Sequence, residues 1–294
     1  MNAEAAVFAE WLRRRGHRVL QTDSAWWYDA APRAYLAFPY HEPITPSAAE
    51  QRTLFREEGA LALRYTAPAA AGGGVLTHHR VAHAPYDLAT LSDKAQKHTR
   101  RALALSIVQP LDWATHAETG RRLAAETAAR QGRRGLNQTV WERLNQAAAD
   151  LPTFEAWGAF VKGELAASLV ACQMGDHCLI LYQQSRTDLL PQMPNNALTF
   201  AFTREVLGRA GVRAVHYGLA GLDAPPSLDD FKRRMGFDAL PVREVIMFHP
   251  VLAPFANRLS LAGIRLLRRV FPHLDALGKV EGMARGAIQG RLRD

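Results

Sequence analysis

Apolar residues recur with two spacings along the second half of the chain, and these spacings predict an ordered series of strands and helices. Three short apolar runs of strand length cover residues 154–161, 164–173 and 178–185. The turn-forming sequences KG and MGDH separate these runs, which predicts an antiparallel meander. Both faces of the meander are mostly apolar, so we expect helices to cover both sides of the sheet.

Helical spacing of apolar residues appears before and after the meander. We expect helices at residues 115–131, 135–150, 195–211 and 227–236, and further strands at residues 105–111, 212–218 and 242–248. Thr139 and Glu142 would form a capping box in the second helix. Asn195 or Asn196 would cap the third helix, and Gly211 would end it.

The two ends of the chain show a less regular pattern. The N-terminal sequence predicts an amphipathic helix. Strands are expected after it at residues 33–40, 60–66 and 75–82, with a helix at residues 47–59 between the first two strands. Ser47 and Glu50 are spaced as a capping box for that helix. Residues 250–294 read as helical, with leucines among arginines. They would either pack on the domain with a solvated basic face or contact a membrane surface.

The order of the predicted elements over residues 87–249 resembles the GNAT acyltransferase fold, and more narrowly the branch related to the Fem peptidyltransferases. The start of a helix at Pro194-Asn195, the segment from Phe231 to Phe237 and the basic sequence KHTRRAL (97–103) carry this narrower resemblance. The resemblance implies an α+β fold with a mixed, mostly antiparallel sheet flanked by helices. It also implies two GNAT-like units, of which the first is degenerate.

The resemblance and the pattern together suggest three consecutive parts. Residues 1–103 would form the degenerate N-terminal unit, residues 104–250 the acyltransferase unit, and residues 251–294 a helical extension.

Composition narrows the class of protein without fixing the partner. An apolar fraction of 48% in 294 residues predicts a packed core, and the net charge of +8 favours anionic partners such as phosphate-bearing cofactors, nucleic acid or a membrane surface. The N-terminus lacks the features of a secretion signal, and no apolar run is long enough to span a bilayer. With only two cysteines, Cys172 and Cys178, a cytoplasmic location is expected.

The resemblance also implies where the chemistry takes place. In GNAT folds the acyl carbonyl is bound by main-chain amides where the fourth strand parts from the fifth, here residues 178–185 and 212–218. The site would therefore lie near Tyr182, as a substrate-binding residue, and near Gln183, Gln184 and Ser185, as cofactor-binding residues.

Three residues near this point are candidates for catalysis. His216 is a candidate base because its ordinary pKa lies near neutrality. Tyr217 is a candidate acid for the leaving thiolate, and Lys232, which matches a lysine of Fem-type proteins, would neutralise charge on the acyl intermediate or on a substrate phosphate. Each side chain could instead have only a structural role. His216 would then be a core histidine, Tyr217 a tyrosine of the sheet, and Lys232 a solvated residue at the end of a helix.

The cofactor pyrophosphate of a GNAT enzyme normally lies on the N-terminus of the next helix, at a glycine-rich loop. Residues 186–196 contain no glycine, so Arg186, Asn195 and Asn196 are the candidates for binding phosphate. Trp27, in the sequence WWYD, would line the site for an acyl or sugar group or else pack in the core. Histidines 79 and 83 lack a third ligand at useful spacing, so no metal site is expected.

Three functions fit these observations. The first is an N-acyltransferase that moves an acyl group from acyl-CoA, as co-substrate, to an amine of a small molecule, sugar or peptide. The second is a Fem-type transferase that uses aminoacyl-tRNA. The third is a non-catalytic binding protein with a GNAT-like scaffold, which the missing glycine loop suggests.

Overall fold

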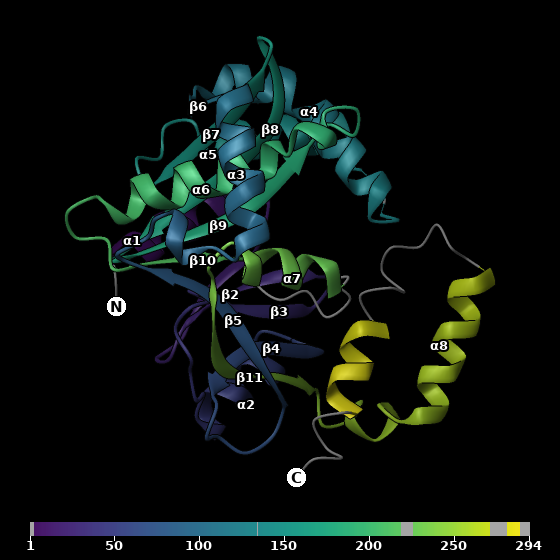
Figure 1. Cartoon of the computed structure of the whole chain (residues 1–294). Helices are drawn as coiled ribbons and strands as arrows, with labels where there is room; N and C mark the ends of the chain where they lie inside the picture. The colour runs from purple at the N-terminus through teal and green to yellow at the C-terminus, as the bar shows by residue number, and fades with distance from the viewer. Residues whose placement is uncertain (1–2, 134, 219–225, 271–280, 289–294) are drawn as a thin grey trace. The chain divides into compact units, whose positions relative to one another are not determined.

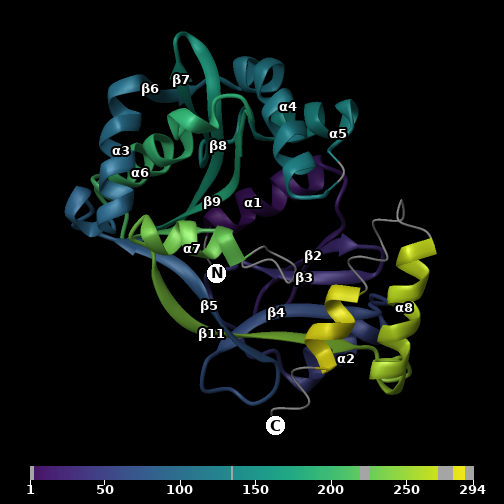
Figure 2. The ribbon, with the colours of Figure 1, turned by 45° about the vertical axis from the view of Figure 1, so that its right-hand side comes forward.

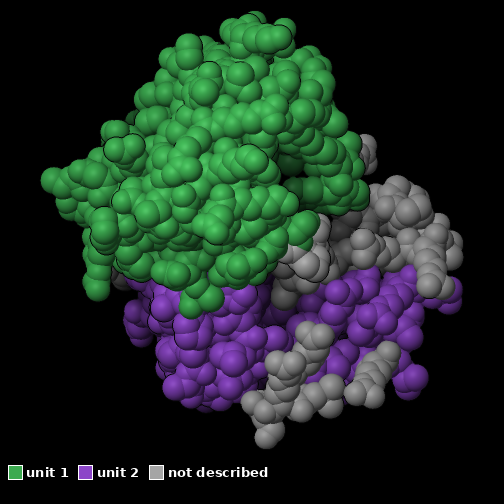
Figure 3. Space-filling view, viewed as in Figure 1, with its two compact units in different colours: residues 1–15, 80–218, 225–239 green, residues 16–79, 219–224, 240–294 purple. Residues whose placement is uncertain are grey.

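The computed structural model of the protein describes residues 3–133, 135–218, 226–270 and 281–288. The chain forms two compact units, coloured separately in Figure 3. Unit 1 consists of residues 1–15, 80–218 and 225–239, and unit 2 of residues 16–79, 219–224 and 240–294. The units therefore interleave along the chain, and the division into three consecutive parts stays a prediction.

Unit 1 is built on a sheet that contains the predicted meander (Figure 1). Its strands are β6 (Ser106–Leu111), β7 (Phe154–Val161), β8 (Glu164–Met174), β9 (His177–Ser185), β10 (Ala214–Tyr217) and the end of β5 (Val75–His83). They pair in the order β5-β10-β9-β8-β7-β6. Only the β9–β10 pair is parallel among these pairings. The antiparallel meander is thus confirmed.

Helices cover both faces of this sheet, as its apolar pattern predicts. They are α1 (Ala3–Arg14), α3 (Asp93–Leu105), α4 (Trp113–Arg130), α5 (Gln138–Ala148), α6 (Pro194–Leu207) and α7 (Pro226–Arg234), with short 3-10 turns η1 (Leu88–Thr90) and η2 (Leu190–Gln192). In Figure 2, α3 and α6 lie on one side of β7, β8 and β9, and α4 and α5 lie on the other. Leu198 and Phe202 of α6 pack in the apolar core with Leu169 of β8.

The predicted capping box of α5 is wrong. The helix begins two residues earlier than that prediction requires, because the side chain of Asn137 accepts a hydrogen bond from the Val140 amide at 2.8 Å and satisfies a free donor of the first turn. Thr139 and Glu142 consequently lie within the helix.

The ends of α6 also differ from the prediction. Pro194 is its first residue, because the first position of a helix needs no amide hydrogen and so suits proline. The preceding residue, Met193, lies in the left-handed region at φ 57°. Asn195 and Asn196 therefore lie in the first turn and do not cap the helix. The helix ends at Leu207 with Gly208 as its C-cap, before Gly211.

Unit 2 is built on five strands with one helix packed against them. Its elements are β1 (Val19–Gln21), β2 (Trp26–Ala31), β3 (Ala34–Phe38), α2 (Ala48–Arg56), β4 (Ala62–Pro68) and β11 (Asp238–Phe248), most of which lies in this unit. The capping box of Ser47 and Glu50 at α2 is confirmed. Leu54 of α2 packs with Trp27 and Leu63 in the core of the unit.

The C-terminal part of unit 2 is helical where the structure describes it. The turn η3 (Ala253–Phe255) leads into α8 (Arg258–Val270), and residues 281–288 form a further helix. Of the predicted extension, residues 271–280 and 289–294 lie outside the described residues. Among the described helices, none has both the length and the apolar character needed to cross a bilayer.

Both units combine helices with strands that are mostly antiparallel, so the protein has the predicted α+β fold. That unit 2 is a degenerate copy of unit 1 stays a prediction.

The fold predicts that Gly236 is needed where the chain turns from α7 into β11. Gly236 has φ +79°, and an added Cβ would lie 2.9 Å from Thr90 Cγ2 and 3.0 Å from Thr90 O. Gly236→Ala should therefore lower the free energy of unfolding by about 2 to 4 kcal/mol, as the sum of left-handed strain and a steric clash. Urea denaturation measures this loss.

Gly132→Ala is the matched control, since Gly132 also has a positive φ, +64°, but no neighbour within 4 Å of the added Cβ. It should lower the free energy of unfolding by only about 1 to 2 kcal/mol. Equal losses in the two variants would contradict the steric argument.

Candidate active site

Strands β9 and β10 run side by side for only four residue pairs. Pairing begins at Ala214 with His177 and ends at Tyr217 with Ile180, whereas β9 continues to Ser185. From Leu181 onward, β9 therefore has a described strand partner only on its β8 side. The two strands part as the resemblance to GNAT folds implies.

A β-bulge lies at the point of divergence. Ala171 of β8 pairs with Ile180, but the preceding residue Val170 pairs with Tyr182, so Leu181 is an extra residue in β9. Bulges bend a strand and re-aim its groups, and they recur beside active sites. Beyond the bulge, the main-chain groups of β9 that face away from β8 have no described strand partner, and the Ser185 amide donates instead to Thr127 Oγ1 at 2.9 Å. Amides in such a stretch could donate to the oxygen of an activated carbonyl.

Lys232 of α7 lies at this divergence. Its Nζ donates a hydrogen bond of 2.7 Å to the carbonyl oxygen of Tyr217, the last residue of β10, and lies 4.8 Å from the centroid of the Tyr217 ring. Burial lowers the pKa of Lys232 to about 8, with Asp229 opposing this effect and Arg80 adding to it. Lys232 is therefore the inward-facing cation of the sequence FKRRMGF, and its pKa lies close enough to neutrality for proton transfer.

Arg80 fixes the helix that carries Lys232. Its guanidinium makes a two-pronged ion pair with Asp229 of α7, at 2.8 and 2.6 Å, and donates to the carbonyl oxygen of Phe237 at 3.2 Å. The side chain is only 8% exposed, and hydrogen bonding to Asp229 raises its pKa. Such a planar, two-point contact holds α7 in one position over the end of β10.

A line of polar side chains runs along β9 away from Lys232. The hydroxyl of Tyr217 and that of Thr199 both donate to Gln183 Oε1, the latter at 3.1 Å. Gln183 Nε2 donates to Asn195 Oδ1 at 3.2 Å, and Asn195 Nδ2 donates to Ser185 Oγ at 3.1 Å. We call Tyr217, Gln183, Thr199, Asn195 and Ser185 the β9 network.

Arg130, at the end of α4, closes the far end of the β9 network. Its Nη2 donates to Ser185 Oγ at 3.0 Å and to Ser185 O at 2.9 Å.

Burial raises the pKa of Tyr217, so its hydroxyl keeps its proton at neutral pH and remains a donor to Gln183.

The structure thus brings five predicted site residues together: Lys232, Tyr217, Gln183, Ser185 and Asn195.

Sequence reasoning missed Arg80, Asp229, Thr199 and Arg130. Arg80 could have been noticed, because an arginine within an apolar strand must find a carboxylate if it is buried.

His216 lies apart from these residues. Neighbouring strand residues point to opposite faces, so His216 faces away from the side on which Tyr217 meets Gln183. Its Nε2 is 2.7 Å from Nδ1 of His177, and its side chain is 4% exposed. We therefore leave His216 out of the candidate site.

Tyr182 and Gln184 also point away from the β9 network, because they alternate with Gln183 along the strand. Tyr182 packs near Trp11 of α1, with 6.5 Å between ring centroids, and its hydroxyl accepts a weak hydrogen bond of 3.4 Å from Arg15. The predicted roles of Tyr182 and Gln184 in the same groove are not supported.

Three further residues predicted for the site have other contacts in the structure. Arg186 pairs with Asp188 at 2.5 Å and with Glu164, and these carboxylates occupy the guanidinium that was expected to bind phosphate. Asn196 Nδ2 lies 3.3 Å from Met235 Sδ, away from the β9 network. Trp27 is 0% exposed, and its indole donates to Thr22 Oγ1 at 3.0 Å, so it is a core residue of unit 2.

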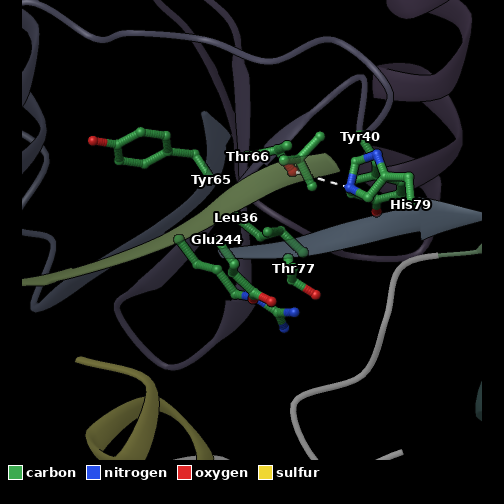
Figure 4. A pocket seen from close by; sticks show the side chains of 9 residues that line it. Leu36, Tyr40, Tyr65, Thr66, Thr77, His79 and Glu244 are labelled. Carbon is green, nitrogen blue, oxygen red and sulfur yellow. Dashed lines mark hydrogen bonds and ion pairs between the residues drawn. The ribbon is translucent and has the colours of Figure 1, made fainter. Parts of the chain in front are cut away.

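A small pocket of unit 2 was not anticipated (Figure 4). It is lined by Leu36, Tyr40, Arg64, Tyr65, Thr66, Thr77, His79, Val242 and Glu244. Arg64 Nε forms an ion pair with Glu244, and Thr66 Oγ1 lies 3.5 Å from His79 Nε2. Because these polar groups pair with one another, we interpret the pocket as a structural feature of the sheet.

Comparison with known proteins agrees with the observed fold. No protein-family model and no curated protein matches the chain. Among solved structures, FemX matches with a TM-score of 0.57 and 11% identity, over 84% of this chain and 92% of FemX. The C-terminal domain of a putative lysylphosphatidylglycerol synthetase from Agrobacterium fabrum matches with a TM-score of 0.55 and 11% identity, over 85% and 88% of the two chains.

L-PGS from Bacillus licheniformis is also similar, with a TM-score of 0.54 and 12% identity over 84% of this chain and 91% of that one. At these identities the likeness shows the fold alone. The fold is GNAT-like and related to that of Fem-type transferases.

The lowered pKa of Lys232 predicts a pH-dependent effect on stability. Below about pH 8 the side chain is protonated in both the folded and the unfolded chain, so folding bears the full cost of burying the charge; above about pH 10.5 it is neutral in both. Lys232→Met should therefore raise the free energy of unfolding near neutral pH, by at most about 3 kcal/mol. The gain should shrink as the pH rises from about 8 to about 10.5.

Urea denaturation of both proteins at about pH 6.5 and about pH 9.5 measures this gain, since other titrating groups cancel in the difference. Arg233→Met is the matched control, because the Arg233 side chain is 60% exposed and pairs with Asp230. A gain from Lys232→Met that does not change with pH would rule out the buried cation as its cause.

Proposed function

We propose that the protein is an acyltransferase that moves an activated aminoacyl group from tRNA to an amine. The observation that carries this proposal is the position of Lys232 at the point where β9 and β10 part. There a cation of lowered pKa lies at the end of β10, where β9 continues without a described strand partner on that side. Such an arrangement suits a reaction in which negative charge develops on a carbonyl oxygen.

The proposed reaction proceeds in two steps. The neutral amine nitrogen attacks the carbonyl carbon of the ester, a carbon–nitrogen bond forms, and the carbonyl electrons move to the oxygen, where β9 amides and the Lys232 ammonium stabilise the charge. When the intermediate collapses, the ester carbon–oxygen bond breaks. Lys232 gives its proton to the leaving hydroxyl oxygen and regains one from the nitrogen that attacked, so the protons balance.

The segment before α6 argues against acyl-CoA as the donor. Residues 186–193 contain no glycine, and the one arginine among them, Arg186, is paired with Asp188 and Glu164. A pyrophosphate would have to compete with two carboxylates for this guanidinium, and glycine-rich backbone that could approach a phosphate closely is missing. These residues do not fit the expected coenzyme.

A basic cluster on unit 1 supports a nucleic-acid donor instead. Lys94, Lys97 and Arg101 of α3 are exposed, at helical spacing, and lie with Arg234 around His98. Burial and then the four cations lower the pKa of His98, which indicates a positive local potential. We call these four cations the α3 cluster; it lies within KHTRRAL and its surroundings, which carried the resemblance to Fem-type proteins.

The names of similar structures are in keeping with this donor. FemX and the domain of a putative lysylphosphatidylglycerol synthetase share the fold, and the latter name denotes a product that contains an amino acid. An amine acceptor on a peptide or a small molecule completes the proposal.

The test is discharge of aminoacyl-tRNA, radiolabelled in the amino acid, to a panel of amines. Lys232→Met should reduce the rate of discharge by about 10²-fold or more, as loss of a group that stabilises an oxyanion does. Arg233→Met, which removes the neighbouring exposed cation, should leave the rate unchanged. Binding of tRNA to the wild-type protein should weaken steeply with salt, and less steeply once Lys97 and Arg101 are replaced by alanine.

Acyl-CoA is the parallel arm of the experiment. Acyl-CoA would be the donor, in place of aminoacyl-tRNA, if two results were obtained. Acyl-CoA would have to raise the melting temperature saturably, and acyl transfer from it would have to depend on Lys232. Failure of both donors to react, or equal rates in wild type and Lys232→Met, would refute transferase chemistry at this site.

A further inference from the structure

Helix α8 of unit 2 carries an exposed apolar stripe. Leu259, Ala262, Gly263 and Leu266 are spaced at three, four and seven residues, so they lie on one side of the helix, and all four are exposed. Leu259 is 84% exposed and Leu266 62% exposed. We call these four residues the α8 stripe.

The other side of α8 already has partners within unit 2. Leu261 is only 8% exposed, and Arg265 Nε pairs at 3.2 Å with Glu281, a buried residue of the helix at 281–288. The helix is thus held in place by one side, while the α8 stripe on its other side remains exposed. The neighbouring residues Val251 and Phe255 are also exposed, at 68% and 65%.

Positive charge is concentrated in the same segment. Residues 250–294 contain eight Lys or Arg and three Asp or Glu, which gives a net charge of +5 out of +8 for the whole chain. Helix α8 itself has four arginines and no acidic residue. An apolar face combined with arginines and low mean hydropathy is the composition of helices that lie in a membrane interface.

We propose that α8 docks the protein on a bilayer surface that contains anionic phospholipid, with the α8 stripe inserted among the acyl chains and the arginines at the headgroups. Exposed leucines favour this occupant over nucleic acid, since phosphate contacts require cations and gain nothing from large aliphatic side chains. The proposal is independent of the proposed acyl transfer, because the stripe and the candidate active site belong to different units.

The test is co-sedimentation of the full chain with vesicles of phosphatidylcholine, with or without phosphatidylglycerol. The wild-type protein should bind vesicles that contain phosphatidylglycerol and bind phosphatidylcholine alone at least about tenfold more weakly, because the arginines meet anionic headgroups. Replacing both Leu259 and Leu266 by glutamine should reduce binding to the anionic vesicles by about tenfold or more, since two leucines that would enter the bilayer are lost.

Ile107→Gln is the matched control, because Ile107 is an exposed aliphatic residue, at 68%, on β6 of unit 1. It should bind as the wild type does. Far-UV circular dichroism of each variant confirms that the exposed substitutions leave the fold intact.

Three results would overturn the proposal. The first is that the wild type does not bind anionic vesicles, and the second is that the double variant binds them as well as the wild type does. The third is that the substitutions only abolish a dimer seen in sedimentation velocity, which would assign the stripe to contact with a second copy of the chain. Loss of tRNA retention in the double variant, without vesicle binding by the wild type, would assign the segment to nucleic acid.

Discussion

The arrangement of unit 1 depends on keeping one ammonium group, that of Lys232, at the end of a strand where water is largely excluded. The carbonyl oxygen of Tyr217 accepts its hydrogen bond, and the ion pair of Arg80 with Asp229 keeps its helix in place. Because a poorly solvated cation is costly, its pKa falls and it gains the capacity to exchange a proton near neutrality. The features that hold Lys232 are therefore also the features that make it reactive.

The β9 network solves a second problem, which is how a strand can lose its neighbour and still remain rigid. Gln183 is the centre of that network, since it accepts from two hydroxyls and donates to Asn195. Side chains of α6 and β10 thus replace part of the missing strand contacts beyond the bulge. The side chains that frame this stretch of β9 are therefore held in fixed positions.

Much of the fold could be predicted from the sequence, because turn residues and strand-length apolar runs specify the meander of β7, β8 and β9 locally. Helix ends were predicted less well, since Asn137 and Pro194 competed with equally suitable residues a few positions away. The parting of β9 and β10 came from the resemblance and not from spacing. Arg80 was missed because its partner Asp229 is 149 residues distant in the chain. The sequence left two positions open for Trp27, because an aromatic pattern does not distinguish a core from a cleft.

The interleaving of the two units has a consequence for the way the protein is made. Unit 1 needs residues 80–83 to flank β10 and residues up to 239 to complete its last segment, and unit 2 needs β11 beside β4. Neither unit can therefore be finished while the ribosome is still translating the first two-thirds of the message. Nascent chains of this protein would spend most of their synthesis without a complete core, and so would depend on chaperones more than a chain with consecutive domains does.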